Sequence, residues 1–289
     1  MSHIWSTVIF QESNDYDIFE KKPSNEILHF GKRKIKSSKL DPHTIADPML
    51  FNHQDKLFIF AEVQRYKENG FINCWSTTDG YQWIDNGPIL QKSFHLSFPL
   101  IFKDNQKIYM VPEQVSFGKT QIYEFKDFPY KPLPVAIISD EPIADPVLFV
   151  EKGTYFLIGT QDEMLKLYFS EDLLENNWSE HPFSRSILSN QIRNAGPILR
   201  YKNKLLRFTQ DCTTNYGDKI IIKEIMISQL HYSEKIIETD FRHSAKNQFD
   251  KLGRHHISLA NFKGNTFIAM DGKMNDFIIN KLMNVLFSI

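Results

Sequence analysis

Apolar and polar positions along this chain follow a unit that repeats about every fifty residues. Each unit opens with two short apolar runs, rich in aromatic and β-branched side chains, on either side of a polar turn, as in MLF-NHQDK-LFIF and LIF-KDNQ-KIYMV. This pattern predicts an antiparallel β-hairpin. The five copies are ADPMLFNHQDKLFIFAE (46–62), SFPLIFKDNQKIYMVPE (97–113), ADPVLFVEKGTYFLIGT (144–160), AGPILRYKNKLLRFTQD (195–211) and HHISLANFKGNTFIAMD (255–271).

A strand-rich repeat of this length is typical of propeller blades, so the sequence predicts one all-β domain folded as a five-bladed β-propeller. Further apolar segments supply outer strands at 70–84, 119–125, 164–170 and 219–230. The segments STVIF and EILHF, near the amino terminus, are expected to close the ring with the fifth blade, because closure hides the sheet edges. The expected division is 1–43 for the ring-closing strands, then 44–92, 93–140, 141–190, 191–252 and 253–289 for blades one to five, the last with a tail.

Three connecting segments carry expectations of their own. The segment STTDGYQWIDNGPIL (76–90) resembles the Asp-box-like turn between outer strands of sugar-active propellers, where Asp-Gly makes a tight bend. The proline-rich FPYKPLP (128–134) is expected to be a loop between the second and third blades. The tail DFIINKLMNVLFSI (276–289) fits an amphipathic helix or a final strand, and packing against a blade is favoured over docking on a membrane or a partner.

Two positions of the repeated hairpin are acidic or otherwise polar in most copies. We number the second residue of each copy as position zero. The second polar position stands fifteen residues later, at the end of the hairpin, so the two positions are expected to lie opposite each other at one end of the sheet. Because blades are arranged radially, both sets are expected on one face, near the mouth of the central channel. Position zero holds Asp47, Phe98, Asp145, Gly196 and His256, and the later position holds Glu62, Glu113, Thr160, Asp211 and Asp271.

Other side chains are expected around the same mouth. His95 and Arg193 each stand three residues before a position zero. Phe94, Phe98, Tyr216 and Trp75 are expected at the mouth or in the loops around it, as aromatic platforms for a ligand. Crowded carboxylates raise one another's pKa values, so that one becomes a general acid while another stays ionised, which is the basis of glycoside cleavage. A carboxylate-lined, aromatic funnel therefore predicts a sugar ligand.

Each of these side chains also has a purely structural explanation. An Asp before Pro, as at Asp47 and Asp145, can cap a turn, and Asp211 can hold its own loop by an Asx turn. Glu62 and Glu113 can be solvated strand ends. The two histidines, His95 and His256, can simply pack loops.

Composition narrows the function classes. The formal net charge is −1, with 34 basic and 35 acidic residues, which gives no electrostatic footprint for nucleic acid or an anionic membrane. No apolar run is long enough to span a bilayer, and the amino terminus does not resemble a secretion signal. Cys74 and Cys212 form no metal-ligand pattern, so a reduced, cytoplasmic protein is expected. No cofactor is predicted; Ca²⁺ on the axis, held by the carboxylate and histidine ring, is the alternative.

The repeated (A)DP hairpins resemble the five-bladed propeller superfamily of arabinanases, β-xylosidases, invertases and levansucrases. In glycoside hydrolase family 43 the first-blade Asp activates water, the third-blade Asp tunes pKa values, and a fourth-blade Glu donates the proton. Asp47 and Asp145 match the first two positions, whereas Ala195 stands where that Glu belongs. The resemblance thus implies Asp47 as base or nucleophile and Asp145 as orienting residue, with Glu113, or else Asp211, as the acid. Ligand contacts are expected from Glu62, His95, Arg193, Asp211, His256 and Asp271.

Three segments, HLSFPLIFKDNQKIYMVPEQ (95–114), AGPILRYKNKLLRFTQDC (195–212) and NYGDKIII (215–222), resemble the amino-terminal propeller of plant glucosamine inositolphosphorylceramide transferases. Related bacterial stretches occur in sugar-biosynthesis clusters. The resemblance implies a carbohydrate-active propeller that binds a sugar or activated sugar, with glycoside hydrolase-like or glycosyl-transfer chemistry. The alternative is a non-catalytic sugar-binding or scaffold module that serves a partner enzyme in surface-glycan synthesis.

Overall fold

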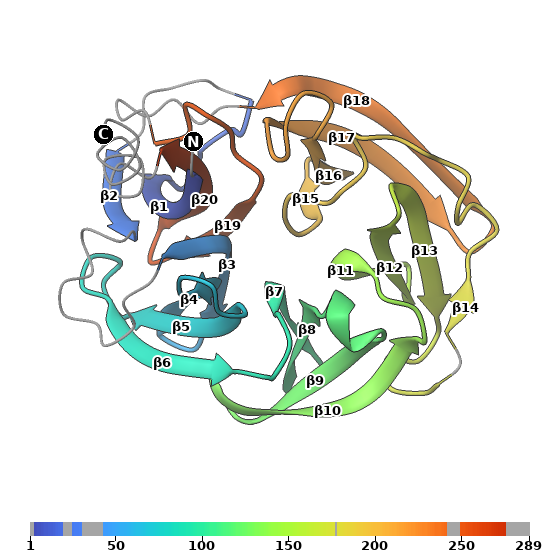
Figure 1. Cartoon of the computed structure of the whole chain (residues 1–289), viewed down its shortest axis with the longest axis horizontal. Coiled ribbons are helices and arrows are strands. Elements are labelled where there is room, and N and C mark those ends of the chain that lie inside the picture. Colours follow the sequence, from blue (N-terminus) through green and yellow to red (C-terminus); the bar gives the residue numbers. More distant parts are fainter. Residues whose placement is uncertain (1–2, 20–24, 31–42, 177, 242–248, 276–289) are drawn as a thin grey trace, which may run out of the picture.

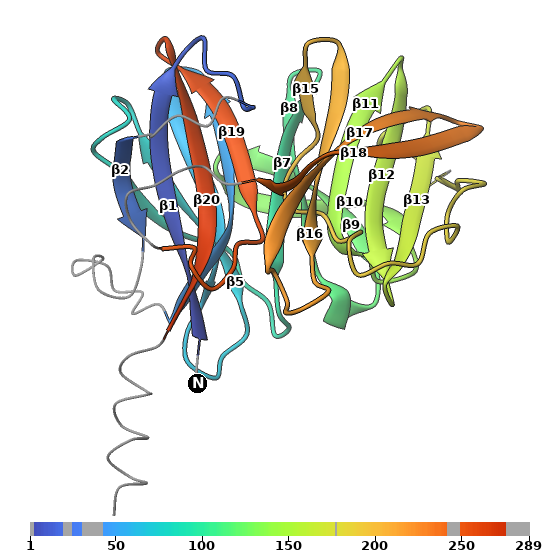
Figure 2. The ribbon, with the colours of Figure 1, turned by 90° about the horizontal axis from the view of Figure 1, so that it is seen from above.

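The computed structural model describes residues 3–19, 25–30, 43–176, 178–241 and 249–275. Five four-stranded antiparallel sheets stand around one axis, which confirms the predicted five-bladed β-propeller (Figure 1). Apart from one turn of 3₁₀-helix, η1 (Val115–Phe117), the described chain is strands and connecting loops. Figure 2 shows the blades from the side, with their strands running roughly along the axis.

Each of the first four blades is built from four consecutive strands, which are numbered from the axis outward. Blade one consists of β3 (Thr44–His53), β4 (Lys56–Gln64), β5 (Phe71–Thr77) and β6 (Ile84–Leu90). Blade two consists of β7 (Ser97–Asp104), β8 (Lys107–Glu113), β9 (Thr120–Asp127) and β10 (Tyr130–Ser139). Blade three consists of β11 (Ala144–Glu151), β12 (Thr154–Gln161), β13 (Met164–Ser170) and β14 (Ser179–Glu180), and blade four of β15 (Leu199–Tyr201), β16 (Lys204–Asp211), β17 (Lys219–Ser228) and β18 (His231–Phe241).

The fifth blade joins the two ends of the described chain. Its sheet has the order β19 (Ile257–Phe262), β20 (Asn265–Asn275), β1 (His3–Ser13) and β2 (Asn25–Phe30), so β1 and β2 contain the segments STVIF and EILHF. Strands β1 and β20 pair without interruption from His3↔Asn275 to Ser13↔Asn265. This pairing closes the ring through backbone hydrogen bonds between residues that are far apart in the sequence.

The core lies between neighbouring blades, because each sheet is covered on both faces. Strand β5 shows the consequence: all seven residues of FINCWST are buried, although a sheet with one solvated face would alternate. Aromatic side chains fill much of the space between blades one and two, where Phe60 lies 5.9 Å from Phe125, ring centroid to ring centroid.

Of the three connecting segments with a predicted structure, one prediction is confirmed and one is wrong. The Asp-box-like turn is present: Asp79 Oδ1 accepts the N–H groups of Tyr81 and Gln82, both at 2.8 Å, and Trp83 Nε1 donates to the Gly80 carbonyl at 3.1 Å. The expectation of a loop at 128–134 is wrong, because Tyr130 begins β10, the outermost strand of blade two. An edge strand tolerates proline, which has no N–H to give to a neighbour. The tail at 276–289 lies outside the described residues.

Candidate functional site

Three inner strands share a bulge at position zero. In blade one Ala46 pairs with Glu62 but Met49 pairs with Phe60, so one extra residue is accommodated there, and β7 and β11 shift in the same way. The residue before position zero therefore opposes the later position, Glu62, Glu113 or Thr160, whereas the sequence pattern placed position zero itself opposite it. At the bulge Asp47, Phe98 and Asp145 have φ values of 52°, 43° and 48°. A left-handed conformation at residues other than glycine costs of order 1–3 kcal/mol, and bulges of this kind re-aim side chains near functional sites.

These bulges surround a polar cavity of about 430 Å³ at one end of the axis. Six of the residues predicted for the site line it together: Asp47, Glu62, His95, Glu113, Asp145 and Arg193. His256, Asp271 and Asp211 are not among its lining residues. The remaining lining residues are Trp5, His43, Thr44, Ala46, Gln64, Ser97, Tyr216 and His255.

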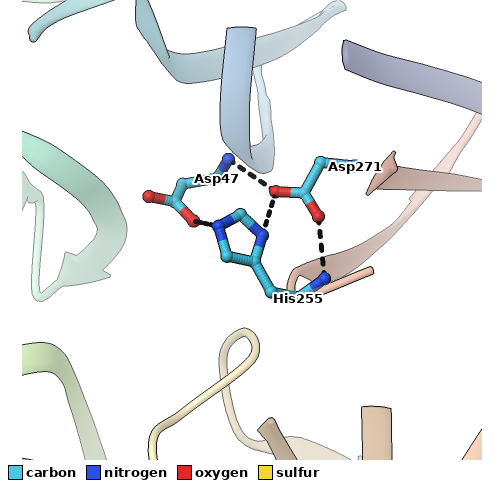
Figure 3. A group of neighbouring side chains, drawn as sticks. All are labelled: Asp47, His255 and Asp271. Carbon is cyan, nitrogen blue, oxygen red and sulfur yellow. Dashed lines mark hydrogen bonds and ion pairs between the residues drawn. The ribbon is translucent and has the colours of Figure 1, made fainter. Parts of the chain in front are cut away.

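Beside the cavity, the Asp271 carboxylate holds Asp47 and His255 in place (Figure 3). Its fully buried carboxylate accepts the backbone N–H of Asp47 at 3.0 Å through Oδ2, and those of His255 and His256 at 3.1 and 2.9 Å through Oδ1. The His255 ring lies between two carboxylates, with Nδ1 2.6 Å from Asp271 Oδ2 and Nε2 3.8 Å from Asp47 Oδ1. Burial lowers the pKa of His255, but the charges of Asp271 and Asp47 outweigh it and raise that pKa above its usual value.

Asp47 is an ionised carboxylate held in place on several sides. Burial raises its pKa, but contacts with His256 and His255 and the N–H of Phe98 outweigh this and lower the pKa to about 2. The Phe98 N–H donates to Oδ2 at 3.1 Å, and His256 Nδ1 lies 3.6 Å from Oδ1. His256 itself is fully buried, with its ring edge-on to Phe98 at 5.0 Å.

Arg193 reaches the cavity from blade four and forms ion pairs with two carboxylates, those of Asp145 and Glu113. Its Nε and Nη2 donate to Asp145 Oδ2 and Oδ1 at 2.6 and 3.1 Å, and Nη2 lies 3.5 Å from Glu113 Oε2. Glu113 Oε2 also accepts the Asp145 N–H at 2.7 Å. Burial and the Asp145 charge nevertheless raise the pKa of Glu113 to about 8, against the opposing effect of Arg193. The guanidinium lies over the Tyr216 ring, 5.2 Å from its centroid.

Glu62 has a different environment from the other carboxylates. Its Oε1 lies 3.3 Å from His95 Nε2, and the Gly70 N–H donates to His95 Nδ1 at 2.9 Å. Since Nδ1 accepts a hydrogen bond, a neutral His95 carries its proton on Nε2, facing Glu62. Burial and the charges of Asp47, Glu113 and Asp271 raise the pKa of Glu62 well above its usual value.

Blade four departs from the predicted register, and this removes Asp211 from the cavity. Gln210 N–H donates to the Arg193 carbonyl and Ala195 N–H to the Phe208 carbonyl, so Ala195 does not oppose Asp211. Asp211 instead accepts the Thr213 N–H at 3.0 Å in an Asx turn. The Ala195 side chain is fully buried in the core with Val8 and Phe208 and does not reach the cavity. An acid could not act on a ligand in the cavity from this position.

The aromatic contribution is also different from the prediction. Trp75 and Phe98 are core residues, and Phe94 stacks on Phe117, so of the four expected aromatics Tyr216 alone lines the cavity. Trp5 is the lining aromatic that the pattern missed, stacked on His255 at 3.8 Å with 5° between the planes. It lies on ring-closing strand β1 opposite Lys273, two pairs beyond Asp271. The sequence predicted that this strand joins the fifth blade, but it did not give the register that brings Trp5 to the cavity.

One group of side chains has the spacing for a metal ion. Asp47, His255 and Asp271 offer ligand atoms that lie within 4.8 Å of one another. Both ring nitrogens of His255 face carboxylates, however, and its raised pKa favours the imidazolium, which a bound cation would have to deprotonate. The contacts among these three side chains account for the geometry without an ion, and axial Ca²⁺ stays the alternative to the prediction of no cofactor. In the part of the chain that the structure describes, no helix is long and apolar enough to cross a membrane.

Solved structures with the same fold include glycoside hydrolases. A family 43 β-xylosidase/α-arabinofuranosidase from a compost metagenome matches with a TM-score of 0.58 at 11% identity, over 80% of this chain and 90% of that one. An α-L-arabinofuranosidase from Clostridium thermocellum matches with a TM-score of 0.56 at 15% identity, over 78% and 81%. At these identities the likeness establishes the fold.

Sequence relatives are closer. Glucosamine inositolphosphorylceramide transferase 1 of Arabidopsis thaliana is 29% identical over 252 residues, which are 81% of this chain and 32% of that protein. The same-named protein of Oryza sativa subsp. japonica is 29% identical over 245 residues, or 79% and 33%. The chain thus spans about a third of the length of these relatives. The model of the amino-terminal region of glucosamine inositolphosphorylceramide transferase 1 matches residues 25–273, and the chain belongs to that family.

Proposed function

We propose that the cavity at the propeller axis is a carbohydrate-binding site, and that holding a sugar, rather than cleaving it, is what this protein does. The observation that carries the proposal is the cavity itself: about 430 Å³, lined by carboxylates, His95 and Arg193, with Trp5 and Tyr216 as aromatic side chains. Ligand pockets are commonly about 300–1,000 Å³ with a few convergent polar groups. A neutral polyol needs many hydrogen-bond partners and an aromatic surface, and this lining offers both.

The state of the carboxylates favours binding over cleavage. Asp47 accepts a backbone N–H, Asp145 is held bidentately by Arg193, and Glu113 accepts another backbone N–H. Carboxylates fixed in this way orient a ligand but have fewer lone pairs left for proton transfer. The position of the family 43 acid is occupied by buried Ala195, and losing a general acid typically costs about 10²- to 10⁴-fold in rate.

The test is a glycan array read with the whole protein, followed by calorimetry on the sugar that binds best. Tyr216→Ala removes an aromatic wall, which should weaken binding about tenfold or more, because stacking and cation–π contacts of this kind contribute of order 1–2 kcal/mol. Tyr81→Ala is the matched control, since this tyrosine is 60% exposed and is not among the lining residues. Absence of binding to every class of glycan, or equal effects of the two substitutions, would refute the proposal.

A second candidate is acid–base chemistry on a glycoside, with Asp47 as base and Glu113 as acid. It is favoured by the separation of their pKa values, about 2 and about 8, which is how two carboxyls take opposite roles at neutral pH. If it holds, Glu113→Gln should slow release of poor leaving groups by about 10²-fold or more and affect nitrophenolates much less, because nitrophenolate departs unprotonated. Undetectable release from both classes of glycoside by a protein that binds sugar would leave binding as the function.

A further inference from the structure

We infer that the protein has a second binding site, in a cavity at its outer rim, and that this site takes a neutral sugar. This outer cavity has a volume of about 380 Å³. It is lined by the end of β10 and the residue after it (137–140), by Tyr168 on β13, and by Asn176 and Trp178 between β13 and β14. Since β10 and β14 are the outermost strands of blades two and three, the outer cavity lies at the rim of the ring (Figure 1). It shares no lining residue with the axial cavity, so the second site goes beyond the proposed function and does not depend on it.

The Tyr168 side chain is a fixed wall of the outer cavity. Its hydroxyl accepts a hydrogen bond from Ser139 Oγ at 3.2 Å and donates one to Glu141 Oε2 at 3.3 Å. Glu141 is held in turn by the buried side chain of Lys166 and by Arg185 Nη2, which lies 2.9 Å from Glu141 Oε1. A wall that is already ordered loses little side-chain entropy when a ligand arrives.

Trp178 is the second aromatic side chain of the lining. It is half-buried and packs against the hydrophobic core that blades two and three share. Tryptophan and tyrosine combine a large amphipathic surface with few rotatable bonds, so contacts with them cost little conformational entropy. The apolar C–H groups of a sugar ring fit against such a surface.

The polar groups of the lining carry no unmatched charge. Asp140 is the one charged residue among those that line the outer cavity, and its Oδ1 lies 2.6 Å from Lys119 Nζ. Asn176 is exposed, and in the described chain its side-chain amide makes no hydrogen bond to another residue. An amide offers both donors and an acceptor, which suits the hydroxyl groups of a neutral sugar. The axial cavity, by contrast, is lined by four carboxylates.

The size and the edge of the outer cavity favour a sugar over a peptide. A volume of about 380 Å³ fits a small ligand, since ligand pockets commonly measure about 300–1,000 Å³. An extended peptide would instead pair with the free edge of β10, but Pro132 and Pro134 remove two N–H donors from that strand.

The test is a calorimetric titration of the whole protein at pH 7 with glucose, galactose, mannose and xylose as probes. At least one of them should bind at two sites. Trp178→Ala should weaken binding at one site about tenfold or more, whereas Tyr216→Ala, in the axial cavity, should weaken binding at the other. Glucuronate, the anionic counterpart of glucose, should bind at the outer cavity no more tightly than glucose does.

Asn176→Ala keeps the experiment decisive if Trp178→Ala does not fold, because Asn176 is exposed; it should weaken the same site about three- to tenfold. Gln106→Ala, which removes an exposed amide in the turn between β7 and β8, is the matched control and should change neither site. Absence of a second site for all four sugars, tighter binding of glucuronate there, or equal effects of Asn176→Ala and Gln106→Ala would overturn the inference and leave the proposed function standing. Binding that responds to Trp178→Ala and Asn176→Ala but not to Tyr216→Ala would support the inference and contradict the proposed function.

Discussion

The Asp271 carboxylate offers the sharpest test of how the cavity floor is built, through Asp271→Asn. The carboxylate accepts three backbone N–H groups and faces His255 Nδ1 at 2.6 Å, all without solvent exposure. The amide keeps the shape but removes the charge and turns one acceptor into a donor that must face N–H groups. Breaking a buried charged pair typically costs about 3–5 kcal/mol.

The loss can be measured by urea denaturation and by thermal unfolding. At about 2.1 cal/mol/K of unfolding entropy per residue, a chain of 289 residues should lose about 5–8 °C in Tm for that cost. Asp55→Asn, in the exposed turn between β3 and β4, is the matched control and should stay within about 0.5 kcal/mol. A loss below about 1 kcal/mol for Asp271→Asn would refute the reasoning.

The same substitution should change the pH dependence of stability. His255 has a raised pKa in the folded state, so its contribution is fully present below the unfolded value of about 6.5 and is lost as pH rises through the folded value. Without the Asp271 charge this decline should become smaller. An unchanged profile above pH 6.5 would contradict the assignment of His255 as an imidazolium.

Three further predictions follow from other contacts. Because the pKa of Glu113 is raised to about 8, the folded state holds this proton more tightly than the unfolded chain, so stability should fall as pH rises from about 4.5 to 8. Glu113→Gln should flatten that fall in denaturation curves, and an unaltered slope would contradict the raised pKa. Gly70→Ala would place a Cβ 2.7 Å from Glu62 Oε1, and should lower ligand affinity about tenfold by calorimetry, whereas Gly118→Ala, with nothing within 4 Å, should not. Asn194→Ala removes the donor to the carbonyls of Asp145 and Ile158, and should cost about 2–4 kcal/mol of unfolding free energy; a loss under 1 kcal/mol would argue against that role.

The fold was predictable because hairpin periodicity is a local signal that recurs five times. The prolines of β10 misled the prediction, since an edge strand and a loop tolerate proline equally well. Ring closure by β1 was accessible from the need to hide sheet edges, but its exact register, and therefore Trp5, was not.

The site was predictable only in part, because spacing does not reveal bulges. Asp47, Glu62, Glu113 and Asp145 gather in one cavity because blades one to three keep the same register and the same bulge. Blade four does not, and its pairing moves Asp211 into an Asx turn that the sequence also allowed. Which carboxylates are tied to N–H groups depends on contacts between neighbouring blades, and no single hairpin encodes those contacts.

The most direct test of the central claim is a crystal structure of the protein with the sugar that binds best on the array. The account predicts that sugar density fills the axial cavity beside Tyr216, with ligand hydroxyls within hydrogen-bond distance of the lining carboxylates. Sugar density in another cavity, lined by Tyr168 and Trp178 among others, with an empty axial cavity would contradict it.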